Sequence, residues 1–200
     1  MGARVLATLR LDRARPGRRA WGQRVFAGVE IDRPFQGYAL NAVDAKGRVS
    51  VPSAFRDLIT TRTRAFAPGD ESISDNELGL LLHEACDRLI AYDAIGIRQL
   101  SSDLRASVAD LPAAERRKAL AELASDEIGS ATTVTFDGAG RLVLPEVLRE
   151  LVGIDKVALF WSSGDFFEIW DPLKARAAFA GNPRKSATLE GLLKTRGFAA

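Results

Sequence analysis

The sequence contains very few of the residues that metal sites, disulfides and histidine-dependent catalysis need. Cys86 is its single cysteine and His83 its single histidine among 200 residues. One cysteine excludes an internal disulfide and a cysteine zinc site, and one histidine excludes a histidine-rich metal site within the chain. The two residues lie three positions apart in a predicted hairpin, where we expect structural or surface roles for both.

Other absences narrow the function further. No Gly-x-x-x-x-Gly-Lys nucleotide loop occurs, and one histidine leaves no recognisable catalytic triad. Carboxylate pairs stay open, because nothing in the sequence shows which acidic side chains meet. No apolar run approaches the 18 residues of a membrane span, and the arginines scattered through the first thirty residues argue against a secretion signal. We therefore expect a cytoplasmic protein that is not an enzyme, with no cofactor, metal, small-molecule substrate or membrane partner.

Positive charge is unevenly distributed along the chain, although the formal net charge is only +2. Residues 1–34 contain eight arginines and three acidic residues, a net charge of +5, which leaves −3 for the remainder. We interpret 1–34 as a disordered basic arm, with an additional phosphate-contacting tail as the alternative. A nucleic-acid surface on the folded part must therefore be local.

The main feature of the chain is a pattern that occurs twice. The first copy is Asp44-Ala-Lys-Gly-Arg-Val-Ser-Val-Pro-Ser-Ala-Phe-Arg56, and the second is Asp137-Gly-Ala-Gly-Arg-Leu-Val-Leu-Pro-Glu-Val-Leu-Arg149. Asp, Gly, Arg, Pro and Arg recur at identical spacing, which indicates an internal repeat. Each copy predicts a turn, a short strand with alternating apolar residues, a proline that ends the strand, and a short helix.

The turn in each copy is expected to fix the direction of the arginine that follows it. An aspartate accepts hydrogen bonds from amides further round the turn, and a glycine supplies the positive φ of a tight reversal. These turn-shaping residues are Asp44 and Gly47 in the first copy, and Asp137 and Gly140 in the second.

Arg48 and Arg141 are the candidate DNA-contacting residues. The planar guanidinium group binds phosphate or a guanine edge through two hydrogen bonds. The alternative is an ion pair with Asp44 or Asp137 that stabilises the turn, and spacing alone leaves both open. Lys46 adds positive charge in the first copy only, so we expect that copy to contribute more.

A second pair of arginines lies one helical turn beyond each proline. Arg56 and Arg149 could reach backbone phosphates from the start of the predicted helices. A role as ordinary surface residues is equally compatible with their positions, so the sequence leaves both alternatives open.

The order of predicted elements is hairpin, short helix, hairpin and longer helix, and it occurs twice, which predicts an α+β fold. We divide the chain into a basic arm, a first repeat, connecting helices, a second repeat with its C-terminal helix, and a flexible tail. These segments are residues 1–34, 35–93, 94–129, 130–180 and 181–200.

The repeated pattern resembles the AbrB-like swapped-hairpin DNA-binding unit. Two copies in one chain, with Glu168-Ile-Trp-Asp171 and Pro112-Ala-Ala-Glu-Arg-Arg-Lys118, resemble the MraZ family of bacterial transcriptional regulators over about 35–179. The resemblance implies two pseudo-symmetric β-hairpin–helix repeats, forming a small β-barrel-like core with flanking helices. In function, it implies a nucleoid-associated repressor of the division and cell-wall gene cluster. Such a protein binds short direct repeats in its own promoter as a ring-shaped homo-oligomer, with the arginine after each turn contacting the duplex.

Two further classes stay open as alternatives. AbrB-like modules also occur in antitoxin-like binding proteins, although one module and a disordered toxin-binding tail are then expected, whereas this chain has two modules. A structural oligomeric protein without a DNA target is the other alternative.

Overall fold

The computed structural model describes residues 25–26, 29–30 and 34–197. Most of the arm predicted at 1–34 lies outside these residues; its described part includes two short paired strands. The elements in chain order are β1 (Val25–Phe26), β2 (Val29–Glu30), β3 (Tyr38–Ala42), β4 (Arg48–Ser50), α2 (Ser53–Phe66), β5 (Glu77–Leu82), β6 (Arg88–Asp93), α3 (Ala94–Ser107), α4 (Ala113–Glu127), β7 (Thr132–Thr135), β8 (Arg141–Val143), α5 (Glu146–Val152), β9 (Val157–Ser162), β10 (Phe167–Trp170), α6 (Pro172–Phe179) and α7 (Pro183–Thr195).

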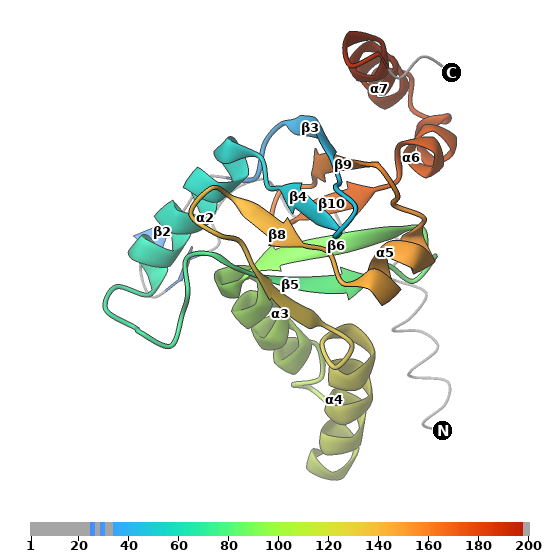
Figure 1. The fold of residues 1–200 in the computed structure, drawn as a ribbon. Helices are drawn as coiled ribbons and strands as arrows, with labels where there is room; N and C mark the ends of the chain where they lie inside the picture. The colour runs from blue at the N-terminus through green and yellow to red at the C-terminus, as the bar shows by residue number, and fades with distance from the viewer. Residues whose placement is uncertain (1–24, 27–28, 31–33, 198–200) are drawn as a thin grey trace.

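The fold is α+β, and its main sheet interleaves the two halves of the chain (Figure 1). Six antiparallel strands lie in the order β3-β9-β10-β6-β5-β7. Among the described strands, none joins the edge strands β3 and β7, so the sheet stays open. The β-barrel-like core that we expected is therefore not confirmed.

The strands that follow the two turns leave the main sheet and pair with each other. β4 and β8 form a separate antiparallel sheet of two strands, in the register Arg48↔Val143, Val49↔Leu142 and Ser50↔Arg141. Next to β3, a single bridge pairs Val43 with Val49, and the Asn41 side chain donates to the carbonyl of Ser50 at 2.6 Å, where the sequence predicted a simple hairpin. We call this pair of strands the β4–β8 ribbon.

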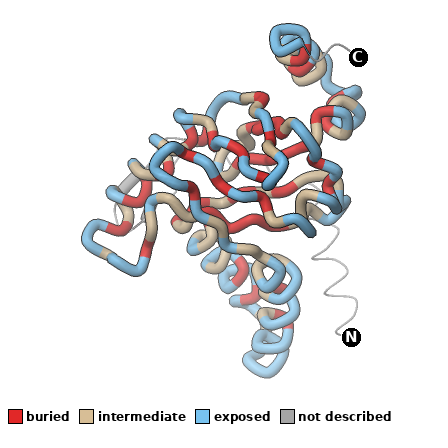
Figure 2. The backbone as a smooth tube through the Cα atoms, viewed as in Figure 1, coloured by how far each residue is buried: buried red, intermediate tan, exposed pale blue. Residues whose placement is uncertain are grey.

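The inner face of the ribbon is part of the protein core. Val49 and Leu142 are each 1% exposed, and they belong to one apolar cluster with Phe55, Phe160 and Phe167. Figure 2 shows the buried positions following the strands, while α4 and α7 are largely exposed. Burial of alternate residues fixes which face of each strand points outward, so the ribbon's other face must lie toward solvent.

The helices extend to opposite sides of the sheet (Figure 1). α3 and α4 form a hairpin with its own apolar cluster on one side, and α6 and α7 lie on the other. Asp171 caps the start of α6, because its carboxylate accepts hydrogen bonds from the amides of Leu173 and Lys174. None of the helices in the described part of the chain is long and apolar enough to cross a membrane.

The predicted flexible tail at 181–200 requires a correction, because α7 forms within it. Asn182 caps the helix by accepting a hydrogen bond from the amide of Lys185, and proline occupies the first turn. Leu189 is fully buried in a cluster that also contains Trp161 and Phe179. Burial of Leu189 against aromatic side chains stabilises a helix that the sequence pattern alone did not predict.

Candidate nucleic-acid interface

The outer face of the β4–β8 ribbon carries both candidate arginines. Arg48 and Arg141 are about half exposed, with 47% and 53% of their side-chain surface accessible. Arg48 lies opposite Val143 and Arg141 lies opposite Ser50, so the two arginines are diagonal neighbours on one face. Diagonal positions in an antiparallel pair are about 7–8 Å apart. The structure thus presents two guanidinium groups from distant parts of the sequence on one small surface.

The two turns have the geometry that the sequence predicts. Asp44 Oδ1 accepts hydrogen bonds from the amides of Lys46 at 2.9 Å and Arg48 at 3.0 Å. Asp137 does the same with the second turn. Gly47 and Gly140 have φ values of 74° and 80°, the left-handed region that glycine adopts without strain.

Each arginine also forms an ion pair with the aspartate of its own turn, the alternative role that the sequence left open. Arg48 Nε lies 2.6 Å from Asp44 Oδ2, and Arg141 Nε lies 3.5 Å from Asp137 Oδ2. Pairing through Nε leaves the terminal amino groups available, because guanidinium has five donors. The ion pair and the outward orientation therefore coexist, with the aspartate fixing the direction of the arginine.

The turn aspartates are held in the ionised form. The pKa of Asp44 is lowered first by the hydrogen bond from the backbone amide of Arg48, and then by the Arg48 side chain. The pKa of Asp137 is lowered chiefly by the backbone amide of Arg141. Hydrogen bonds to a carboxylate favour its charged form. The carboxylates of both turns are therefore ionised at neutral pH, as an ion pair with the following arginine requires.

The second pair of arginines braces the turns across the two copies. A Cβ atom added at Gly140 would lie only 2.6 Å from Arg56 Cζ, and one added at Gly47 would lie 3.7 Å from Arg149 Nε. Arg56 Nε also donates to the carbonyl of Val51 at 3.2 Å. Arg56 and Arg149 are half-buried, so each packs against the turn of the opposite copy.

Backbone hydrogen bonds join the same turns to the opposite strands. The amide of Leu144 donates to the carbonyl of Gly47 at 2.9 Å, and the amide of Val51 donates to that of Gly140 at 2.8 Å. These bonds extend the ribbon at both ends and fix the positions of the turns relative to each other.

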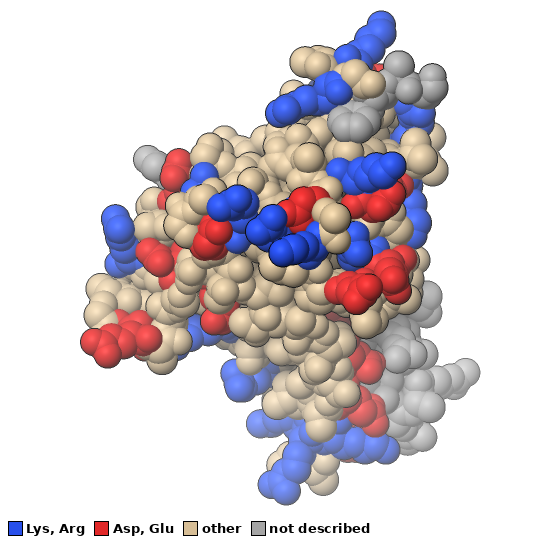
Figure 3. Space-filling model, in the orientation of Figure 1, with Lys and Arg blue, Asp and Glu red and all other residues tan. Residues whose placement is uncertain are grey.

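The two ends of the ribbon differ in charge. Lys46 is exposed beside Arg48, whereas exposed Ala139 takes the corresponding place beside Arg141. Asp57 and Asp75 line a hollow that Asp137 also borders. Figure 3 shows basic side chains gathered in the middle of the view, where Figure 1 places the ribbon, with acidic groups beside them. The Arg48 end is thus the more basic one.

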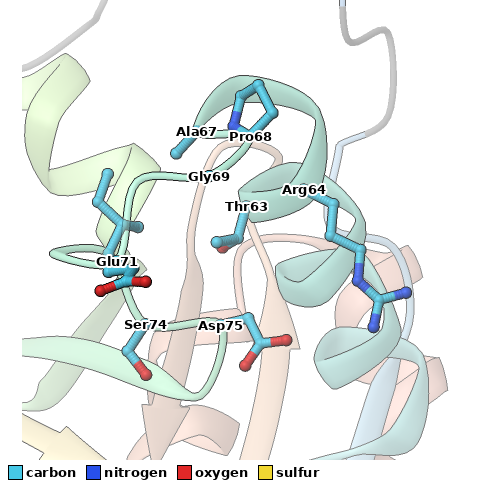
Figure 4. Close-up of a pocket in the computed structure, with 9 residues that line it drawn as sticks. Thr63, Arg64, Ala67, Pro68, Gly69, Glu71, Ser74 and Asp75 are labelled. Carbon is cyan, nitrogen blue, oxygen red and sulfur yellow. The ribbon is translucent and has the colours of Figure 1, made fainter.

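A separate pocket lies where the C-terminal end of α2 meets the following loop (Figure 4). Thr63 and Arg64 come from the helix, and Glu71, Ser74 and Asp75 come from the loop. Thr63 and Arg64 lie seven and eight residues after Arg56 on α2, so the helix places them about 10–12 Å further along its axis. The pocket is therefore not part of the ribbon surface. Within the described ranges, no group of three or more Cys, His, Asp and Glu side chains could hold a metal ion.

Comparison with known proteins identifies the class of the chain. A family model described as "MraZ protein, putative antitoxin-like" matches residues 128–177. The protein named Transcriptional regulator MraZ from Ruegeria sp. (strain TM1040) is 34% identical over 71% of this chain and 80% of its own length. Its namesake from Rhodospirillum rubrum is 32% identical over 79% of this chain and 92% of its own length. The namesake from Parvibaculum lavamentivorans is 32% identical over 76% and 83%, respectively.

These relatives define a class of transcriptional regulators, and their similarity extends well beyond the second repeat. The chain belongs to the MraZ family.

The sequence singled out the two arginines that the structure exposes on the ribbon, but two features of their surroundings were not predicted. It did not predict that β4 pairs with β8, which places Ser50 and Val143 on the same face as the arginines. It also did not predict that Arg56 and Arg149 pack on the opposite turns. The identical spacing of the two copies was the available signal, because equivalent strands of a repeat are natural partners for each other.

Proposed function

We propose that the chain is a sequence-specific regulator that binds double-stranded DNA through the outer face of the β4–β8 ribbon. The observation that carries this proposal is that Arg48 and Arg141 lie exposed on one face of the ribbon. The major groove of B-DNA admits a two-stranded ribbon, and arginine binds guanine edges and phosphates through paired hydrogen bonds. Asp44 and Asp137 orient the two guanidinium groups before DNA arrives, which lowers the entropy lost on binding.

The other basic residues support the same surface. Lys46 adds a charge at the Arg48 end, so the first copy contributes more to affinity. Arg56 and Arg149 hold the turns, and they remain candidates for phosphate contacts from the edges of the ribbon. We treat the two copies as pseudo-symmetric repeats. In support, the counterparts in the two copies are β3 and β7, β5 and β9, and β6 and β10. When each strand is exchanged with its counterpart, the strand order β3-β9-β10-β6-β5-β7 is the same order read in reverse.

Assembly supplies the affinity that one ribbon lacks. Residues 35–200 carry a formal net charge of −3, so one chain neutralises few phosphates and gains little from counterion release. Linked copies engage repeated sites with a high effective concentration. We therefore propose a homo-oligomer, in ring form by the family resemblance, that binds short direct repeats in its own promoter. From the same family resemblance, we propose that it represses the division and cell-wall gene cluster and acts in the cytoplasm at the nucleoid.

Footprinting on the DNA upstream of the protein's own gene tests this proposal. The full chain is expected to protect a regular series of short repeats. Arg48→Ala is expected to weaken binding by about 1–3 kcal/mol, the size of one lost bidentate contact. Arg117→Ala is a matched control, because Arg117 is exposed on α4 away from the ribbon. Equal affinity of the two variants and the parent chain would contradict the proposal.

An antitoxin-like role is the second candidate, because the family description includes that term. Such a protein forms a complex of fixed stoichiometry with a co-expressed toxin. Its affinity for that partner would not depend on Arg48. A structural oligomer would instead assemble without binding any duplex, so the affinity for DNA separates it from the regulator, and binding of the toxin identifies the antitoxin-like role.

A further inference from the structure

Val143 is an exposed apolar side chain on an otherwise polar surface. It is 53% exposed, although Val49 and Leu142 on the other face of the ribbon are almost completely buried. Its direct neighbour across the ribbon is Arg48. In the described part of the chain, Val143 does not belong to the buried core. Its side chain lies within the proposed DNA-binding surface.

The equivalent position in the first copy has a different chemistry. Ser50 follows Arg48 by two residues, as Val143 follows Arg141, and Ser50 lies opposite Arg141. One end of the ribbon therefore combines an arginine with two methyl groups, whereas the other combines an arginine with a hydroxyl. Lys46 belongs to the first of these ends, so the asymmetry in charge and the asymmetry in apolar contact coincide.

From this arrangement we infer that Val143 is a specificity-determining residue that contacts the 5-methyl group of a thymine in the major groove. The inference rests on the function proposed above and adds a base preference to it. Thymine is the base that presents an apolar group in that groove, and aliphatic side chains contact it there. Serine pairs with several bases through its hydroxyl, so Ser50 discriminates less.

The geometry of the ribbon suits such a contact. Side chains directly opposite each other in an antiparallel pair have Cβ atoms about 4.5–5.5 Å apart. That separation is comparable to the rise of about 3.4 Å between successive base pairs, so Arg48 and Val143 meet the same or adjacent base pairs. Valine has a stiff χ1, which means that little side-chain freedom is lost when the methyl groups pack.

An asymmetric ribbon reads DNA in one direction. If the two ends were chemically alike, a two-fold ribbon would favour a palindromic site. Because the Arg48–Val143 end favours thymine and the Arg141–Ser50 end does not, the preferred site is non-palindromic and has an orientation. Sites with a fixed orientation fit an operator of direct repeats.

Thymine methyl groups can be removed singly by replacing thymine with deoxyuridine, which keeps every hydrogen-bonding group. The probe is a fluorescent duplex selected by the full chain from a random library, with each thymine replaced in turn. We expect one thymine at one end of the site at which deoxyuridine weakens binding of the parent chain by about fourfold, the effect of one buried methyl group. Val143→Ala is expected to bind the thymine duplex more weakly and to lose this sensitivity. Val147→Ala, which changes a valine that is 69% exposed on α5, is expected to keep it.

The outcomes separate the inference from the proposed function. Equal deoxyuridine sensitivity in Val143→Ala and the parent chain, or no sensitive thymine at all, would overturn the role of Val143. If Arg48→Ala still weakens binding in that case, the proposed function stands. A chain that selects no sequence, with Arg48→Ala binding as well as the parent, would overturn both. Thermal melts of each variant show that the fold is retained.

Discussion

Arg56 in the first copy packs its guanidinium group directly over Gly140 in the turn of the second copy. Arg149 lies against Gly47 in the reciprocal arrangement, with more space. Each of the two turns is therefore held by a residue that lies about 80 to 100 positions away in the chain. At Gly140 the contact gives a reason for glycine beyond the positive φ of the turn, whereas a Cβ at Gly47 would meet Arg149 only at an ordinary van der Waals distance.

Replacement of Gly140 by alanine is expected to destabilise the fold more than replacement of Gly47. Both positions have a positive φ, which costs an L-residue about 1–3 kcal/mol. At Gly140 the new methyl group would also overlap Arg56, whereas at Gly47 its closest contact would be the Leu144 carbonyl oxygen at 3.2 Å. Urea denaturation measures the difference. Gly138→Ala is the control in the same turn, since a Cβ there meets nothing within 4 Å, and equal losses at 138 and 140 would contradict the packing argument.

Loss of the Arg56 side chain is expected to act on stability and on DNA binding together. Arg56→Ala removes the packing against Gly140 and the hydrogen bond to Val51, and a loss of about 0.5–1.5 kcal/mol is expected for the hydrogen bond alone. A phosphate contact by Arg56 would in addition reduce the slope of log K against log salt by about 1. Titrations at four salt concentrations separate the two roles. An unchanged slope with lower stability would leave Arg56 as a positioning residue only.

The turn aspartates are expected to make stability depend on pH on the acid side. The pKa of each is lower in the folded chain than its ordinary value of 3.8. Their contribution is therefore complete above 3.8 and is lost as the pH falls through their lowered values. The Asp44→Asn, Asp137→Asn double variant keeps the acceptor oxygens but cannot titrate there. As the pH falls below 4, the unfolding free energy of the double variant is expected to decrease less than that of the parent chain.

Buried Asp93 does not disturb this comparison, because it is present in both chains. Burial raises its pKa, against the attraction of Arg62, so its contribution changes with pH in the opposite direction. If the unfolding free energies of the parent and the double variant decreased equally below pH 4, the turn carboxylates would not be held in the ionised form.

Helix α7 is expected to be an integral part of the fold. Leu189 is fully buried, and a buried leucine replaced by alanine typically costs about 2–5 kcal/mol. Leu173→Ala is the control, because that leucine is 67% exposed and exposed substitutions usually stay within about 0.5 kcal/mol. Thermal unfolding followed by Trp fluorescence compares them, since Trp161 lies in the same cluster as Leu189. An effect of Leu189→Ala no larger than the control would mean that α7 does not stay packed.

Local chemistry explains how much of the site was predictable from sequence. The Asp44 turn, the positive φ at Gly47 and the position of Arg48 depend on residues within five positions of one another, so the motif determines them. Strand pairing is different, because alternation identifies the buried face of a strand without naming its partner. The pairing of Arg48 with Val143, and the packing of Arg56 on Gly140, therefore required the structure.

The tail illustrates the same limit. Asn182 and Pro183 form a recognisable helix start, but a short amphipathic segment is marginal until it packs. What stabilises α7 is the aromatic cluster around Trp161 and Phe179, which combines the preceding helix α6 with distant strands. No pattern within residues 181–200 contains that information.

DNA binding by the two ribbon arginines is measured by fluorescence anisotropy of the Arg48→Ala, Arg141→Ala double variant with a duplex from the promoter region of the protein's own gene. We expect a folded protein whose affinity falls by more than that of either single variant, about 1–3 kcal/mol for each lost contact, and whose salt dependence becomes shallower. A folded double variant that binds with the parent's affinity and salt dependence would contradict DNA binding by these arginines.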